Sequence, residues 1–337
     1  MRESKLQKLL HVLKKHDHKN DVYNYAIPDL WNAWNYQGEE MVRTSWGELI
    51  VNPYNFYSEV IQSYILPQAK DDVNYNQSLS QIKQSYEAKP GYLGGDWIKD
   101  SVVYSMMVRT STAWDHDRSG DLENHNLYDL NETGTFVKSL ALLPLLKKMG
   151  VDTVYMLPIS KFSLKDKKGE LGSPYGVCNF FEIDPSLKDN MTGSELTVEE
   201  EFQAFVEACH ILDMKVMIDI IPRTNSVESD LILEHPDWFY WVYTDTFHEY
   251  YPPYVPGLGS TLPPKPEYLP YVYSSQAVWN HIHKFSYAPN IIDPEKWERV
   301  VEEYRQTPGA SILDLVSREF GLTVAPAFSD HINDVQP

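Results

Sequence analysis

The stretch MKVMIDIIPRTNS, residues 214–226, carries the pattern that decides the fold. It begins as an apolar run rich in β-branched residues, which is typical of a buried strand, and it ends in polar residues that start with a carboxylate, Asp219. Polar residues that follow the strands of a parallel sheet gather at one edge of that sheet. The role of Asp219 therefore depends on which strands precede it.

Two similar apolar runs come earlier, SVVYSMMV at residues 101–108 and VDTVYMLPI at residues 151–159. Segments 133–150 and 196–214 lie between the runs and have apolar residues at helical spacing. The order is strand, helix, strand, helix, strand. This alternation predicts an α/β fold with a parallel sheet whose strands are buried on both faces.

The rest of the chain lacks this alternation. Residues 1–98 open with a predicted helix that contains Leu6, Leu9 and Leu13, and then become heterogeneous, which indicates a separate N-terminal region. Residues 244–272 are so rich in proline that neither a helix nor a central strand is expected there. We predict an inserted subdomain or lid over residues 244–337, with helices at 294–304 and 310–320.

Composition limits the class of protein. The chain has 337 residues, 42% of them hydrophobic, which is enough for a sizeable core. Its 29 Lys and Arg against 48 Asp and Glu give a net charge of −19, so no nucleic-acid partner is expected. Two cysteines, no secretion signal and no apolar run of about 20 residues predict a soluble, cytoplasmic protein without a membrane partner. A homo-oligomer is left open.

Polar residues follow each predicted strand. Arg109, Tyr175, and Asp219 with Arg223 come after the first, second and third strands. We expect them to converge on one cleft, because the carboxyl ends of parallel strands share an edge. A purely structural role is equally open for Asp219, which could tie two loops together through backbone N–H groups, with Arg223 as its ion-pair partner.

Metal sites have weaker signals. His210 follows a cysteine on a predicted helix, and His281 and His283 alternate as in a strand, but no Cys or carboxylate pattern around them supports zinc. The acidic loop at residues 115–126 lacks the closing Glu of a calcium loop. We predict exposed histidines, a solvated loop, no metal and no cofactor; calcium at the loop stays open.

Four stretches together resemble a known family. VVYSMMVRTS, GVDTVYMLPI, SPYGVCNFFEIDP and MKVMIDIIPRTNSVESD are similar, in this order, to the first three strands of the α-amylase superfamily, glycoside hydrolase family 13. The resemblance implies the first part of a (β/α)8 TIM barrel over residues 99–243. It also implies that Tyr175, which is followed by Phe181 and by Asp184 as in the family, stacks on the sugar at the cleavage point.

The residues that follow the third predicted strand favour one subgroup of this family. Asp219 matches the family's Asp-x-x-x-Asn-His pattern, whereas Arg223 and Thr224 replace its Asn and His. The stretches IPRTNSVESDLILEHPDWFYW and FSDHINDVQP resemble the bacterial maltosyltransferases of this superfamily. The resemblance implies retaining transfer between α-1,4-glucans or maltooligosaccharides, with Arg109, Tyr175, Asp219, Arg223 and Thr224 as substrate-binding residues.

The family's catalytic carboxylates have no counterpart here. The nucleophile of the family follows the fourth strand in a Gly-x-Arg-x-Asp pattern, which these 337 residues lack. We therefore expect a fragment that ends before the fourth strand, with its catalytic residues downstream of Pro337 and no activity of its own. An α-glucan hydrolase fragment and a non-catalytic sugar-binding protein are the alternatives.

Overall fold

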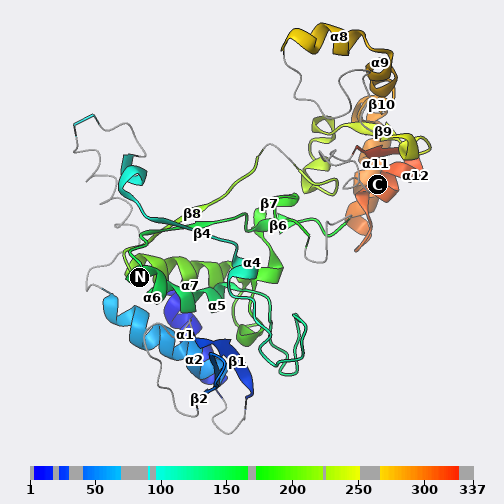
Figure 1. Ribbon diagram of the computed structural model, residues 1–337. Coiled ribbons are helices and arrows are strands. Elements are labelled where there is room, and N and C mark those ends of the chain that lie inside the picture. The colour runs from blue at the N-terminus through cyan, green and yellow to red at the C-terminus, as the bar shows by residue number, and fades with distance from the viewer. Residues whose placement is uncertain are drawn as a thin grey trace. The chain divides into compact units, whose positions relative to one another are not determined.

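The computed structural model describes residues 4–17, 23–29, 41–69, 90–91, 96–165, 172–222, 225–250 and 266–325. The chain forms two compact units, shown in Figure 1. Unit 1 comprises residues 1–159 and 182–220, and unit 2 comprises residues 160–181 and 221–337. Arg223, Thr224 and most of the proline-rich segment lie outside the described residues.

A parallel sheet of three strands runs through unit 1. Its order is β4 (Val103–Met106), β5 (Thr153–Met156) and β8 (Lys215–Ile218). Met106 pairs with Met156, and Met156 pairs with Ile218, both in parallel register. This sheet confirms the predicted parallel strands.

Helices connect these strands as the apolar spacing predicts. The first connection contains α5 (Phe136–Ser139), a 3₁₀ turn and α6 (Leu143–Lys148), and the second contains α7 (Val198–Ile211). Thr197 starts α7 with a capping box: its hydroxyl accepts from the N–H of Glu200, and the Glu200 carboxylate accepts from the N–H of Thr197. Val198, Phe205 and Ala208 are buried on one side of α7. The predicted strand and helix alternation is confirmed.

The outer strands of the sheet are less buried than predicted. Val103 on β4 is 43% exposed and Ile218 on β8 is 39% exposed, whereas Val154 on β5 is fully buried. Among the described strands of this sheet only β5 has a neighbour on each side, and the labelled helices α5, α6 and α7 lie on one side of the strands in Figure 1. The prediction of strands buried on both faces is therefore wrong for β4 and β8.

The N-terminal part of the chain packs into unit 1. It consists of α1 (Lys5–Lys15), β1 (Tyr25–Pro28), β2 (Val42–Arg43), β3 (Glu48–Val51) and α2 (Pro53–Glu59), which continues into a π-helical stretch, Val60–Ile65. The three strands are antiparallel in the order β1-β3-β2. Leu9, Tyr25 and Phe205 share one hydrophobic cluster. The two compact units thus divide the chain at other residues than the predicted parts 1–98, 99–243 and 244–337. Those three parts stay a prediction of the domain organisation.

Unit 2 has its own core. β6 (Ser160–Phe162) pairs with β7 (Val177–Ile183), and β10 (Phe285–Ser286), β9 (Trp241–Tyr243) and β11 (Leu322–Val324) form an antiparallel sheet in that order. Its helices are α8 (Leu269–Ser274), α9 (Gln276–Ile282), α10 (Pro289–Ile292), α11 (Pro294–Gln306) and α12 (Ile312–Phe320). Trp241, Val316 and Leu322 are buried in its hydrophobic cluster.

Several expectations for unit 2 can be compared with these elements. Helices α11 and α12 confirm the two helices predicted near residues 294–304 and 310–320. Helix α8, however, begins inside the proline-rich segment, where no helix was expected. Its proline, Pro270, is in the first turn, where the missing N–H has no helical partner to lose. Among the described residues, no helix is both long and apolar enough to cross a membrane.

Candidate functional site

The carboxyl edge of the parallel sheet carries two of the predicted residues. Arg109 lies in α4 (Val108–Ser111), the short helix that follows β4, and Asp219 directly follows β8. The ladder extends to this edge, because Leu157 N donates to Met106 O at 2.9 Å and Asp219 N donates to Met156 O at 2.8 Å. The sheet therefore places Arg109 and Asp219 at the same edge, and their convergence on one cleft stays a prediction.

Arg109 is buried and lies near Asp184, a carboxylate other than Asp219. Its side chain is only 6% exposed. Burial lowers the pKa of Arg109, and the negative charge of the nearby Asp184 opposes this effect. Asp184 is also 6% exposed and accepts a hydrogen bond from Ser186 N at 2.8 Å, so its carboxylate is held in place. Asp184 was not among the predicted binding residues. Its position in the stretch SPYGVCNFFEIDP, which resembles the family, could have indicated it.

Gly134 contacts the backbone of α4, the helix that contains Arg109. Its N–H donates to Arg109 O at 2.7 Å. A Cβ atom at this position would lie 2.0 Å from Val108 O and 2.9 Å from the Thr112 hydroxyl. No side chain fits there, so the loop that contains Gly134 packs directly against the backbone of Arg109.

The other predicted residues are placed differently. Tyr175 belongs to unit 2, in the turn before β7, where Gly176 N donates to Ser173 O at 3.0 Å. Its ring is 41% exposed, and Phe181 on the following strand is 90% exposed. Arg223 and Thr224 lie outside the described residues. Of the five predicted binding residues, the structure thus brings Arg109 and Asp219 to one edge.

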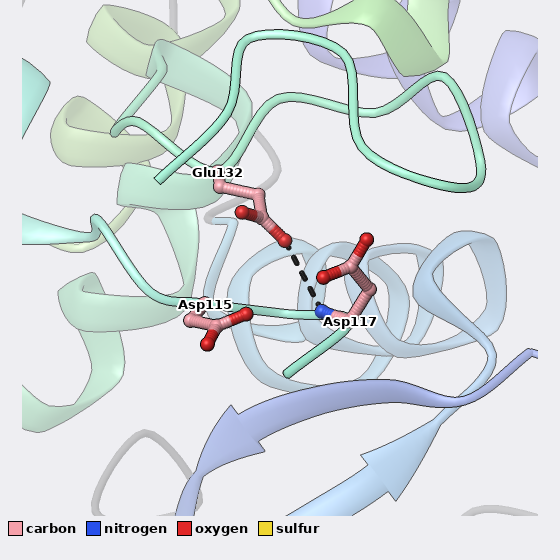
Figure 2. Close-up of side chains that lie close together, drawn as sticks. All are labelled: Asp115, Asp117 and Glu132. Carbon is pink, nitrogen blue, oxygen red and sulfur yellow. Dashed lines mark hydrogen bonds between the residues drawn. The ribbon is translucent and has the colours of Figure 1, made fainter. Parts of the chain in front are cut away.

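An acidic cluster lies in the loop that leads from α4 to α5. Figure 2 shows the side chains of Asp115 and Asp117 on one stretch of backbone and that of Glu132 on another, with the Glu132 carboxylate accepting from the N–H of Asp117. One carboxylate oxygen from each lies within 4.8 Å of the others, which is the spacing of a metal site. These carboxylates nevertheless accept hydrogen bonds from the loop itself.

Glu132 is the centre of this cluster and is fully buried. One of its oxygens accepts from His116 N at 2.9 Å and from Asp117 N at 3.1 Å, and the other accepts from Glu123 N at 3.1 Å. The amide of Asn126 also donates to Glu132, at 3.1 Å. Glu132 therefore organises the loop by binding its donors.

Asp115 and Asp117 hold the outer turn of the same loop. Asp115 accepts from Ser119 N at 2.9 Å and Gly120 N at 2.8 Å, and Asp117 accepts from Leu127 N at 3.0 Å. The bond from the N–H of Leu127 is the largest cause of the lowered pKa of Asp117. Residues 118–125 of this loop are exposed, in agreement with the prediction of a solvated loop, whereas Asp115 and Asp117 are half-buried and bind the loop's own backbone.

The histidines differ from the prediction of exposed side chains. His210 on α7 is half-buried, and burial is the main cause of its lowered pKa. His281 is also half-buried and lies on α9, a helix, so the strand-like spacing with His283 is not realised. Of these three histidines only His283 is exposed, and its ring centroid lies 3.6 Å from that of Trp279.

Comparison with known proteins identifies similar sequences for part of the chain. No family model matches it. An α-1,4-glucan:maltose-1-phosphate maltosyltransferase from Salinibacter ruber is 30% identical over 128 residues, which cover 33% of this chain and 18% of the relative. An enzyme of the same name from Cereibacter sphaeroides is 28% identical over 170 residues, which cover 46% of this chain and 24% of the relative.

Solved structures were compared as well. The crystal structure of an α-amylase from Lactobacillus plantarum is 30% identical, with a TM-score of 0.31, over 42% of this chain and 27% of the amylase. The chain therefore spans about a fifth to a quarter of the length of the curated relatives it matches. The resemblance to maltosyltransferases of the α-amylase superfamily is confirmed over this matched part.

Proposed function

We propose, from this similarity to bacterial maltosyltransferases, that the chain supplies part of the sugar-binding side of an enzyme that acts on α-1,4-glucans. In this proposal β4, β5 and β8 are the first three strands of a (β/α)8 barrel. The observation that carries it is the sheet edge that bears Arg109 and Asp219, in a chain of which about a third is similar to those enzymes. Active sites of such barrels lie at the carboxyl ends of the strands.

Each proposed binding residue has a distinct task. The exposed ring of Tyr175 stacks on the apolar face of a glucose unit. Asp219 accepts hydrogen bonds from sugar hydroxyls, and Arg109, whose positive charge is stabilised by the charge of Asp184, donates to them or orients a neighbouring carboxylate. Arg223 and Thr224 add donors beside Asp219. These groups bind and orient the sugar without breaking a bond.

Retaining transfer needs two further carboxyl groups. A nucleophilic carboxylate attacks the anomeric carbon while a carboxylic acid protonates the leaving sugar; an acceptor hydroxyl then attacks the glycosyl-enzyme and returns that proton. The Gly-x-Arg-x-Asp pattern of the nucleophile is absent from this sequence. We propose that the 337-residue chain by itself binds maltooligosaccharides but does not convert them.

Binding of maltotetraose to the full chain tests this proposal. Tyr175→Ala should weaken binding about tenfold, because an aromatic contact is lost, whereas Tyr175→Phe should retain it. Tyr287→Ala is the matched control, since Tyr287 is another exposed tyrosine of unit 2, at 76%. Calorimetry of the four proteins measures the affinities, and equal affinity of the chain with and without the Tyr175 ring would refute the assignment.

Product analysis separates the alternatives. Longer and shorter oligosaccharides formed from maltotetraose indicate transfer, and glucose or maltose formed with water indicates an α-glucan hydrolase. Binding without any product supports the chain as a sugar-binding part. Turnover by the purified 337-residue chain would contradict the proposed inactivity.

A further inference from the structure

Unit 2 contains a cavity of about 330 Å³ that includes none of the residues discussed above as substrate-binding. It lies between the β6–β7 pair, residues 228–233 and the start of α12, and all of its lining residues belong to unit 2. Small-molecule sites have volumes of roughly 300–1,000 Å³, so this cavity suits a small ligand.

Two carboxylates in the lining are held by the β6–β7 pair. Ser163 Oγ donates to Glu228 Oε2 at 2.6 Å, and Asn179 Nδ2 donates to Asp230 Oδ2 at 2.8 Å. Within the described residues, no hydrogen bond reaches the second oxygen of either carboxylate. Glu228 and Asp230 therefore offer fixed acceptors to a ligand.

Donors line the same cavity. They belong to Ile312 and Leu313, the first two residues of α12, and to Lys161. Backbone N–H groups in the first turn of a helix have no partner within the helix. The cap of α12 uses the next N–H, because Asp314 N donates to Ser311 Oγ at 3.3 Å.

The charges of the lining nearly cancel. Glu228 and Asp230 contribute two negative charges, Lys161 contributes one positive charge, and the start of α12 contributes about half a positive charge from its dipole. An anion would face both carboxylates, and a cation would face Lys161 and the helix end. A neutral ligand avoids both penalties.

Apolar residues line the cavity beside the polar groups. Phe162, Leu164 and Leu233 are among them, together with the aromatic residue Tyr304. A sugar ring has this same division, with C–H groups on its faces and hydroxyls on its rim that both donate and accept. We propose that the cavity binds a neutral sugar of one or two rings. This site is additional to the proposed glucan site, since it contains neither Tyr175 nor the sheet edge of unit 1.

Cys178 provides a built-in reporter of occupancy. Its thiol lines the cavity, is 8% exposed, and donates to Lys161 O at 3.4 Å. Burial is the main cause of its raised pKa, with Asp230 acting in the same direction, so the group is a thiol and reacts slowly. The other cysteine, Cys209, is fully buried in α7 of unit 1 and serves as the reference.

The experiment measures alkylation of Cys178 in the full chain by mass spectrometry, with glucose, with maltose and without sugar. The proposal expects one of these sugars to slow the alkylation of Cys178 at least fivefold without changing that of Cys209. Glu228→Gln should raise the sugar concentration for half protection about tenfold, because a charged acceptor is lost. Ser163→Ala, which releases the Glu228 carboxylate, should act in the same direction.

Two matched variants complete the design. Glu234→Gln removes an exposed carboxylate that does not line the cavity and should leave protection unchanged. Tyr175→Ala should also leave it unchanged, so failure of this site and failure of the proposed glucan site are distinguishable. Absence of protection by either sugar overturns the proposal, and protection by tetramethylammonium alone overturns it in favour of a cation site.

Discussion

The buried carboxylates of unit 1 and the cavity carboxylates of unit 2 differ in how many hydrogen bonds their oxygens accept from the protein. Glu132 accepts from three backbone N–H groups and one amide, and Glu201 accepts from Thr192 Oγ1 at 2.6 Å and Asp189 N at 2.9 Å. Glu228, by contrast, accepts from a single hydroxyl, that of Ser163, among the described residues.

This difference separates carboxylates that hold the fold from those that can hold a ligand. A buried carboxylate whose acceptor sites are filled by the chain has little capacity left for a ligand, and its removal strands several donors. A half-buried carboxylate with one protein partner retains acceptor capacity, and its removal costs the fold little. The following variants test this separation, beginning with the largest expected effect.

Glu201 should make the stability of unit 1 depend on pH. Burial, together with the charge of Asp189, raises its pKa from 4.5 to about 8. The folded state therefore binds more protons than the unfolded state between these values, and stability should fall as pH rises from about 5 to 8, by on the order of 4 kcal/mol. Urea unfolding at several pH values measures this slope, which Glu201→Gln should flatten.

A buried lysine in the same unit, Lys138, makes stability depend on pH in a different range. Burial lowers the pKa of Lys138 from 10.5 to about 7, against the opposing charges of Asp189 and Glu132. The folded state binds fewer protons than the unfolded state above pH 7, so this group makes stability rise from there. A wild-type stability that is constant from pH 5 to 8 would contradict the effect assigned to Glu201.

Glu132→Gln should destabilise the chain by about 3 kcal/mol, because the new amide group meets donors and leaves some of them unsatisfied. The control is Glu123→Gln, an exposed neighbour in the same loop, which should change stability by less than about 0.5 kcal/mol. Chemical unfolding followed by circular dichroism measures both. Equal stability of the two variants would show that the acidic cluster does not organise its loop.

Glu228→Gln should destabilise the chain less than Glu132→Gln does, by no more than about 1 kcal/mol, because the new amide oxygen can still accept from Ser163. The same unfolding measurement applies. A loss as large as that of Glu132→Gln would place Glu228 among the carboxylates that hold the fold, and would remove the contrast between the two regions.

The sequence predicted the parallel strands because apolar, β-branched runs alternate with helical spacing, and both patterns are local. It overestimated the burial of β4 and β8, because a run such as that around Val103 does not reveal how many strands or helices will cover it. The contact between α1 and α7 was also missed. It depends on Glu207, which accepts from Ser4 Oγ at 2.8 Å across more than two hundred residues of chain.

The candidate site was predictable in part. The placement of Arg109 and Asp219 at one edge was predictable because the strand ends of a parallel sheet share an edge, and their role in binding stays a prediction. The charge of Asp184 beside Arg109 was not predicted, because the two residues are distant in sequence and only the fold brings them together. The cavity of unit 2 was not predicted for the same reason, since its lining comes from five separate stretches of the chain, residues 161–164, 178, 228–233, 304 and 310–313.

Gly134 has a consequence for how this protein can change by mutation. A library that randomises position 134 should lose nearly all of its members, alanine included, because every Cβ would collide with Val108 O. At Gly176, whose added Cβ would come no closer than 3.5 Å to Ser173 O, alanine fits. Position 134, near Arg109, therefore tolerates only glycine, whereas position 176, beside Tyr175, also tolerates alanine.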